Sequence, residues 1–191
     1  MGNGTGTSYA GVTLGNGANN QALYINDVSE FSGFSTAAII NKAKGTVEIK
    51  DSVFKTNTNA DIDNSGTLNL KGTNSFEKII DTDNSGTMNV MTGSSTVSDT
   101  LTQNTVEISD GASLINSGTA SIGTLNLNSG ALLTNNGTVN TTGTNNDSIS
   151  GSGSFTVDTG SFTNKGSFAQ NTLSFANNGT FVSFGTDTIS I

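Results

Sequence analysis

The feature that most constrains the fold is a short phrase, Asn-x-Gly-Thr/Ser, that keeps returning along the chain. Its copies begin at Asn64, Asn84, Asn116, Asn135, Asn164 and Asn177, and residues 43–46 form a weaker copy. A turn followed by a short strand, repeated at a roughly constant interval, is typical of a solenoid in which each repeat packs against its neighbours. The phrase therefore predicts a coiled, repetitive architecture.

The strand that follows the turn reads Thr, apolar, polar, apolar. Copies occupy residues 46–49, 67–70, 87–90, 105–108 and 124–127, followed by 154–157 and 172–175. The first five copies begin 21, 20, 18 and 19 positions apart. This alternation predicts two inward side chains and one outward side chain per strand. A coil of about 20 residues is too short for two strands and a crossover helix, which need about 30. It suits three short strands joined by three turns.

We therefore predict an all-β chain folded as a right-handed parallel β-helix, a three-faced solenoid of about nine coils. Residues 1–30 are expected to form an irregular N-terminal cap or the first coils, and residues 31–191 a single repeat domain. Phe34, Phe54 and Phe76 are expected to fill a second inward column. The glycine of the phrase is expected to supply a positive φ or a tight turn.

The phrases come closer together after residue 111, at intervals of 13 or 14 residues. We interpret this as the turn phrase appearing on more than one side of a coil. The alternative is a switch to a smaller left-handed or two-sided solenoid.

Composition limits the class of protein further. Hydrophobic residues make up 32% and charged residues 12% of the 191, while Pro, Cys and His are absent. So few apolar residues suit stacked coils, because each coil buries only a small inward face. The net charge of −8 argues against nucleic acid and anionic membrane surfaces as partners. No apolar stretch is long enough to insert into a bilayer, and Met1-Gly2 is expected to begin a piece cut from a longer chain.

The strand Asn-x-Gly-Thr-Leu-Asn-Leu, without Cys and with few aromatic residues, resembles the β-helical passenger of bacterial autotransporters and filamentous-haemagglutinin-like exoproteins. The resemblance covers residues 30–191. It implies export through the outer membrane, a location outside the cell or on its surface, and a role in adhesion, self-aggregation or biofilm. The implied partners are a receptor on a host or bacterial surface, or copies of the same chain.

Two acidic segments form a candidate calcium site. Residues 61–66 and 81–86 both read Asp-x-Asp-Asn-Ser-Gly, which matches the first half of a calcium loop. On stacked rungs Asp61 would lie over Asp81 and Asp63 over Asp83, and a cation between them would relieve the repulsion. The alternative is a solvated turn that caps its own backbone. No other cofactor is expected.

A candidate self-association stripe follows the outward middle position of the strands. Its main members are Asn69, Asn89 and Asn126. The remaining positions are Glu48, Glu107, Thr156 and Ser174. Stacked amides and hydroxyls favour contact with a neighbouring rod through many weak hydrogen bonds, or they simply stabilise the solenoid.

The sequence thus predicts a non-catalytic adhesin or stalk segment. A carbohydrate-active β-helix enzyme or a carbohydrate-binding tail-type protein is the alternative, and the lack of His and Arg opposes the enzyme. An ice-binding array of Thr-x-Thr pairs is not indicated, because such pairs do not recur at the coil interval.

Overall fold

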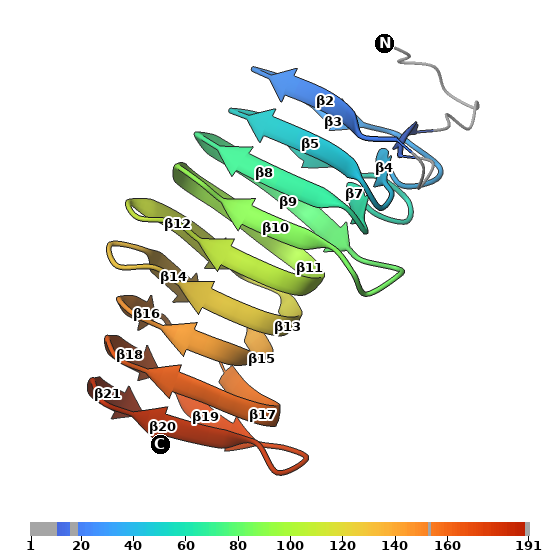
Figure 1. Ribbon diagram of the computed structural model, residues 1–191. Coiled ribbons are helices and arrows are strands. Elements are labelled where there is room, and N and C mark those ends of the chain that lie inside the picture. Colours follow the sequence, from blue (N-terminus) through green and yellow to red (C-terminus); the bar gives the residue numbers. More distant parts are fainter. Residues whose placement is uncertain (1–10, 16–18, 153, 190–191) are drawn as a thin grey trace.

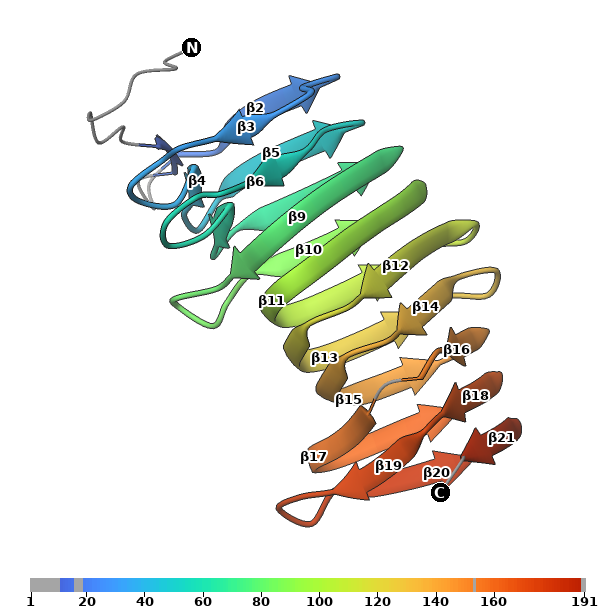
Figure 2. The same ribbon diagram turned by 180° about the vertical axis from the view of Figure 1, so that it is seen from behind.

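Short strands separated by tight turns wind the chain into a right-handed β-solenoid of about eight turns, close to the number predicted. The computed structural model describes residues 11–15, 19–152 and 154–189. With the N-terminal end at the top, the strands nearest the viewer run from right to left in both Figure 1 and Figure 2. A chain that descends in this way is a right-handed coil. The described residues contain no helix, and so none that could span a membrane.

The strands stack in three parallel columns, which we call faces A, B and C. Face A contains β2 (Gln21–Asn26), β5 (Gly45–Lys50), β8 (Thr67–Lys71), β10 (Thr87–Val90), the C-terminal parts of β11 (Gly93–Ile108), β13 (Thr119–Leu127), β15 (Thr138–Asn145) and β17 (Ser154–Asn164), and β20 (Thr180–Ser183).

Face B contains β1 (Val12–Leu14), β4 (Ile39–Asn41), β7 (Ile62–Asn64), the C-terminal part of β9 (Thr73–Ile80), the middle of β11, the N-terminal parts of β13, β15 and β17, and β19 (Thr172–Phe175). Face C contains β3 (Phe31–Ser32), β6 (Phe54–Lys55), the N-terminal parts of β9 and β11, β12 (Ala112–Asn116), β14 (Leu132–Asn135), β16 (Ser148–Ser150), β18 (Ser167–Gln170) and β21 (Thr186–Ile189).

Equivalent residues of successive coils lie beside one another, as the repeat predicts. Leu68 pairs with Met88, and both side chains are fully buried. The turn phrase appears at all three corners of the coil, because Asn64 ends a face B strand, Asn116 a face C strand and Asn164 a face A strand. The closer phrases after residue 111 therefore do not mark a smaller solenoid.

Asparagines at the ends of strands, including several that begin the phrase, are buried at the corners and form ladders between coils. Asn41 Nδ2 donates to Oδ1 of Asn64 at 2.7 Å, and Asn116 Nδ2 donates to Oδ1 of Asn135 at 2.9 Å. The same amide nitrogens also donate to backbone carbonyls, such as that of Thr67 at 3.0 Å. A buried amide N–H needs an acceptor, and stacking supplies one for each of these Nδ2 groups.

The glycine of the phrase has a different role from the one expected. Gly86, Gly118, Gly137 and Gly166 do not have a positive φ. A Cβ on Gly137 would instead lie 1.9 Å from the carbonyl oxygen of Gly118 in the coil before. Glycine is required here because successive backbones approach too closely for a side chain.

Aromatic residues fill the core at the two ends of the solenoid. Phe31, Phe54 and Phe76 form one stack, with ring centroids 5.0 and 5.2 Å apart. The prediction placed Phe34 in this column. The register pairs Phe31 with Phe54, and Phe34 stacks beside Phe31 at 5.0 Å. Near the C-terminal end, Phe155 packs against other phenylalanines at 4.9 and 5.1 Å.

The described part of residues 1–30 already belongs to the sheet. β1 pairs with β4, and β2 pairs with β5 along its whole length. Residues 1–10 and 16–18 of the predicted cap or first coils lie outside the described residues.

Candidate functional site

The register does not stack the four predicted calcium ligands in pairs. Across β7 and β9, Asp63 pairs with Ile80, and the Asp61 backbone N–H donates to the carbonyl oxygen of Lys78 at 2.9 Å. Residues 81–86 follow β9 as a turn, so Asp81 does not lie over Asp61. The stacking on which the calcium prediction depended is therefore wrong.

Asp61 acts as a buried cap of the backbone. Its side chain is 1% exposed and accepts hydrogen bonds from Asn57 Nδ2 at 2.8 Å and from the backbone N–H groups of Glu77 (2.6 Å) and Lys78 (3.0 Å). Burial raises the pKa of Asp61 above its ordinary value of 3.8, although these hydrogen bonds partly oppose the shift. The carboxylate oxygens are thus occupied by donors of the protein.

The other three carboxylates have separate partners. Asp63 accepts from the backbone and hydroxyl of Thr82 at 3.1 and 2.6 Å. Asp81 accepts from the backbone of Gly86 at 2.6 Å, which closes the turn. Asp83 lies 3.8 Å from the amine of Lys42. In the described ranges, no group of three or more potential ligands could hold a metal ion. Calcium binding stays a prediction.

Face A carries two outward columns that run side by side. The first contains six threonines in register, Thr46, Thr67, Thr87, Thr105, Thr124 and Thr142. The second contains the first five members of the predicted stripe, Glu48, Asn69, Asn89, Glu107 and Asn126, and continues through Thr144 and Thr163. Asn89 Nδ2 donates to Oδ1 of Asn69 at 2.9 Å, so part of the stripe is a hydrogen-bonded ladder.

The last two members of the predicted stripe lie elsewhere. Thr156 pairs with Asn140 and with Ser174, which places all three on face B. The same Thr/Ser-apolar-polar-apolar pattern occurs on both faces, and the sequence alone did not separate them. Thr144 and Thr163 occupy the corresponding positions on face A.

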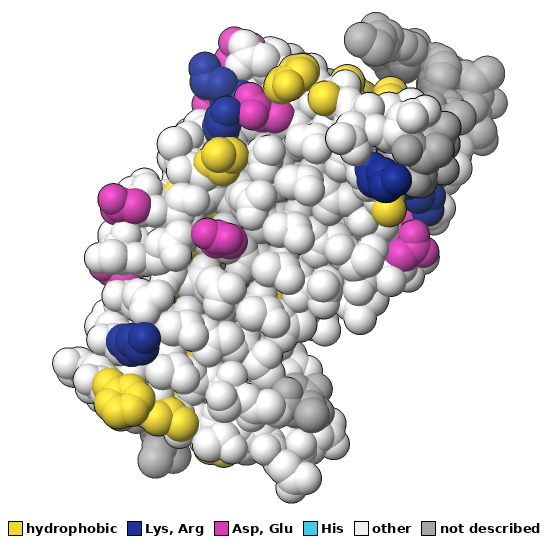
Figure 3. Space-filling view, in the orientation of Figure 1, with side chains coloured by type: hydrophobic (Ala, Val, Ile, Leu, Met, Phe, Trp, Pro, Cys, Tyr) yellow, Lys and Arg dark blue, Asp and Glu magenta, His cyan; other side chains and the backbone are white. Residues whose placement is uncertain are grey.

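Few charges interrupt face A. Near its N-terminal end Glu48 is paired with Lys71 at 2.8 Å. Glu107 separates Asn89 from Asn126 and accepts from Asn128 Nδ2 at 3.1 Å. Figure 3 shows this side of the molecule as mostly uncharged and polar, with most charged groups near its margins and one acidic group within the polar area. Such a surface offers many neutral donors and acceptors over a long, nearly straight strip.

Face B carries a second polar array, which the sequence analysis missed. Two outward columns are in register over five coils. Each coil contributes one residue to each column, and the columns run Thr100, Thr119, Thr138, Ser154, Thr172 and Thr102, Ser121, Asn140, Thr156, Ser174. A search for strict Thr-x-Thr pairs overlooked this array, because Ser and Asn replace Thr at several positions.

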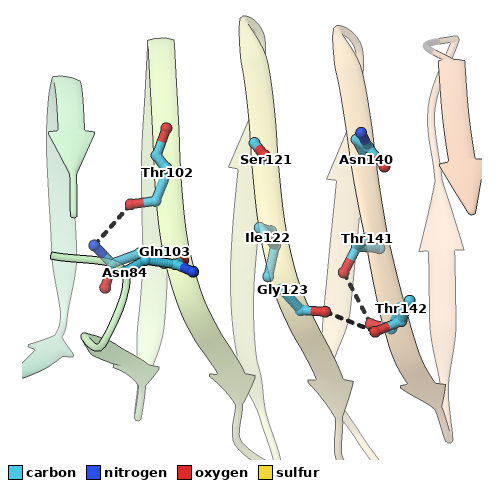
Figure 4. Close-up of a pocket in the computed structure, with 9 residues that line it drawn as sticks. All are labelled: Asn84, Thr102, Gln103, Ser121, Ile122, Gly123, Asn140, Thr141 and Thr142. Atoms are coloured by element: carbon cyan, nitrogen blue, oxygen red, sulfur yellow. Dashed lines mark hydrogen bonds between the residues drawn. The ribbon is translucent and has the colours of Figure 1, made fainter. Parts of the chain in front are cut away.

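A shallow groove of about 220 Å³ lies on this array, where face B turns towards face A (Figure 4). Thr102, Ser121 and Asn140 lie in a row on three neighbouring strands, β11, β13 and β15. The turn that contains Asn84 borders one end. Gly123, the extra residue at a register shift between β13 and β15, lies in the lining.

These observations define the class of protein as a three-faced parallel β-solenoid. No family model, curated protein or solved structure matches the chain.

Proposed function

We propose that the chain is a rigid, non-catalytic rod of a secreted or cell-surface bacterial protein, and that it associates with copies of itself through face A. The observation that carries this proposal is the pair of in-register columns, six threonines beside the Asn stripe. The resemblance of the repeat to autotransporter passengers supports export through the outer membrane, and with it a role in adhesion, aggregation or biofilm.

The chemistry of face A favours contact between rods. Neutral amides and hydroxyls can exchange hydrogen bonds with water for hydrogen bonds with a partner at little desolvation cost, whereas buried charges cost several kcal/mol each. The side chains of the Thr column are already half-buried and lie in register, so little side-chain entropy is lost on binding.

The shape of the molecule also supports a rod. About eight stacked turns at ~4.8 Å each give a length of about 40 Å. A straight strip of this length allows many weak contacts to act together on one partner, which raises the total affinity.

The net charge of −8 sets the expected dependence on salt. Two copies of this acidic chain repel each other at low ionic strength. At 0.1 M salt the repulsion between charges more than about 10 Å apart is largely screened. Association through a neutral face should therefore strengthen as salt is raised. Association driven by opposite charges would weaken instead.

Sedimentation velocity over a range of protein concentrations tests the proposal. The triple variant Asn69→Lys/Asn89→Lys/Asn126→Lys places three charges in the stripe and should stay monomeric where the wild type associates. The matched control, Ser94→Lys/Ser113→Lys/Thr134→Lys, adds the same charge on face C. It should associate at least as well as the wild type. Equal association of the two triple variants would overturn the role of face A.

A further inference from the structure

We propose that the groove on face B binds an uncharged polysaccharide, with the sugar chain lying along the axis of the rod. The groove is formed by hydroxyl and amide side chains at equivalent positions of three successive coils, Thr102, Ser121 and Asn140 (Figure 4). The row of Thr102, Ser121 and Asn140 lies on face B, and Thr142 is the one residue of the groove lining that also belongs to the Thr column of face A. The proposal does not depend on self-association.

The lining excludes charged ligands. Every side chain that borders the groove is neutral, so neither a cation nor an anion finds a counter-charge there. The net charge of −8 further disfavours polyuronates and other acidic glycans. A ligand with many neutral hydroxyl groups fits this surface best.

Two of the hydroxyls are available to a ligand. Within the described part of the chain, the side-chain oxygens of Thr102 and Ser121 make no hydrogen bond to another protein group, and Ser121 is exposed. Other polar groups in the lining are already held in place. Thr142 Oγ1 donates to the carbonyl oxygen of Gly123 at 2.6 Å, and Thr141 Oγ1 donates to that of Thr142 at 2.8 Å. The groove thus combines fixed walls with free hydrogen-bonding groups.

Gly123 lies in the groove lining at an irregularity of the sheet. This residue has no partner in β15, where the register shifts between Ile122 and Thr124. A Cβ at Gly123 would come within 2.7 Å of the carbonyl oxygen of Asn104. Ile122, which is 4% exposed, gives the lining a small apolar surface of the kind that C–H faces of a sugar ring contact.

The repeat of the solenoid suits a polymer better than a single sugar. Polar groups recur at ~4.8 Å from coil to coil along the axis. A linear chain of sugar units can therefore place hydroxyls against several coils at once, and the individual contacts add. A lone monosaccharide would contact at most part of this row.

Affinity electrophoresis and isothermal titration test the proposal with named probes. The neutral probes are laminarin, dextran and soluble xyloglucan, and polygalacturonate is the acidic comparison. We expect at least one neutral polymer to bind the wild type and polygalacturonate not to bind. The variant Thr102→Val/Ser121→Ala keeps the shape but removes two hydroxyls, so it should bind about tenfold more weakly.

The control variant, Ser113→Ala/Thr134→Val, makes the same chemical changes on face C and should bind as the wild type does. The proposal is overturned if no neutral probe binds, if polygalacturonate binds best, or if the two double variants lose affinity equally. Circular dichroism of each variant confirms that the fold is retained. Self-association is read separately by sedimentation, so failure here leaves the proposal for face A intact.

Discussion

The side-chain amide of Asn64 donates a hydrogen bond to Oε1 of Gln103, 39 residues further along the chain, at 2.8 Å. The next copy of the phrase begins at Asn84, but Asn84 is exposed and has a positive φ of 52° in the turn that Asp81 closes, so it does not continue the ladder. Gln103 is one methylene longer than asparagine and reaches across the gap. Asn135 and Gln170 repeat this solution at another corner, also at 2.8 Å.

Replacing Gln103 by alanine should destabilise the solenoid. The Gln103 side chain also donates to the backbone carbonyls of Thr102 (2.8 Å) and Ile80 (3.2 Å), so its loss leaves several buried polar groups without partners. We expect the free energy of unfolding in urea to fall by about 1–3 kcal/mol. Asn126→Ala, at an outward position, should change it by less than about 0.5 kcal/mol. Equal effects of the two substitutions would contradict the buried ladder.

Gly137→Ala tests whether the glycine of the phrase is required for space. The new methyl group would meet the carbonyl oxygen of Gly118 at 1.9 Å, which forces two coils apart. We expect a loss of about 1–3 kcal/mol in the free energy of unfolding. Gly111→Ala is the matched control, because Gly111 has a positive φ of 70° but open space around it. It should cost only about 1 kcal/mol. A larger effect at Gly111 would favour the backbone angle as the reason for the phrase.

The solenoid itself was predictable, because the repeat appears in every coil and a single misread residue changes little. The turn phrase predicted where the chain turns between faces, and the alternation predicted which side chains point inward, as with Leu68 beside Met88. The Phe31 column was not predictable from spacing, because Phe31 and Phe34 both precede a turn and only the pairing with Phe54 separates them. Local pattern thus specifies the coil, while register between coils decides the columns.

Asp61 should titrate above its ordinary pKa of 3.8, because burial disfavours its charged form. The native state then holds this proton more tightly than the unfolded chain does. The stabilisation from Asp61 is full below the unfolded pKa and is lost as the pH rises through the native pKa. Relative to Asp61→Asn, which cannot titrate, the wild type should therefore lose stability as the pH rises above 3.8. Urea unfolding of both proteins at several acidic pH values measures the difference, and a wild type that gains stability would contradict the shift.

The alternative to the calcium site, a turn that caps its own backbone, predicts that calcium leaves the thermal stability unchanged. The oxygens of Asp61 accept protein donors, Asp63 accepts from Thr82, Asp81 accepts from Gly86 and Asp83 faces Lys42. No group of three or more potential ligands among the described residues could hold a metal ion. We expect the same midpoint of thermal unfolding in millimolar calcium and in chelator. A rise with calcium that disappears in Asp83→Asn would support the calcium hypothesis instead.

The candidate surfaces were only partly predictable. The stripe through Asn69, Asn89 and Asn126 followed from counting positions in well-matched repeats. The continuation of the stripe beyond Asn126 could not be predicted in this way, because the strand at Thr156 has the pattern of a face A strand but lies on face B. The groove lining includes the extra residue Gly123, which is recognised as extra only when neighbouring coils are aligned. Irregularities of this kind leave no repeating signal in the sequence.

Chemical cross-linking through face A tests the central proposal most directly. The chain has no cysteine, so Asn89→Cys and Ser113→Cys each introduce a single thiol, one on face A and one on face C. Each variant is treated with a short bis-maleimide under conditions where the wild type associates. We expect a cross-linked dimer with Asn89→Cys and almost none with Ser113→Cys. Equal yields from the two variants, or a higher yield from Ser113→Cys, would contradict the pairing of rods through face A.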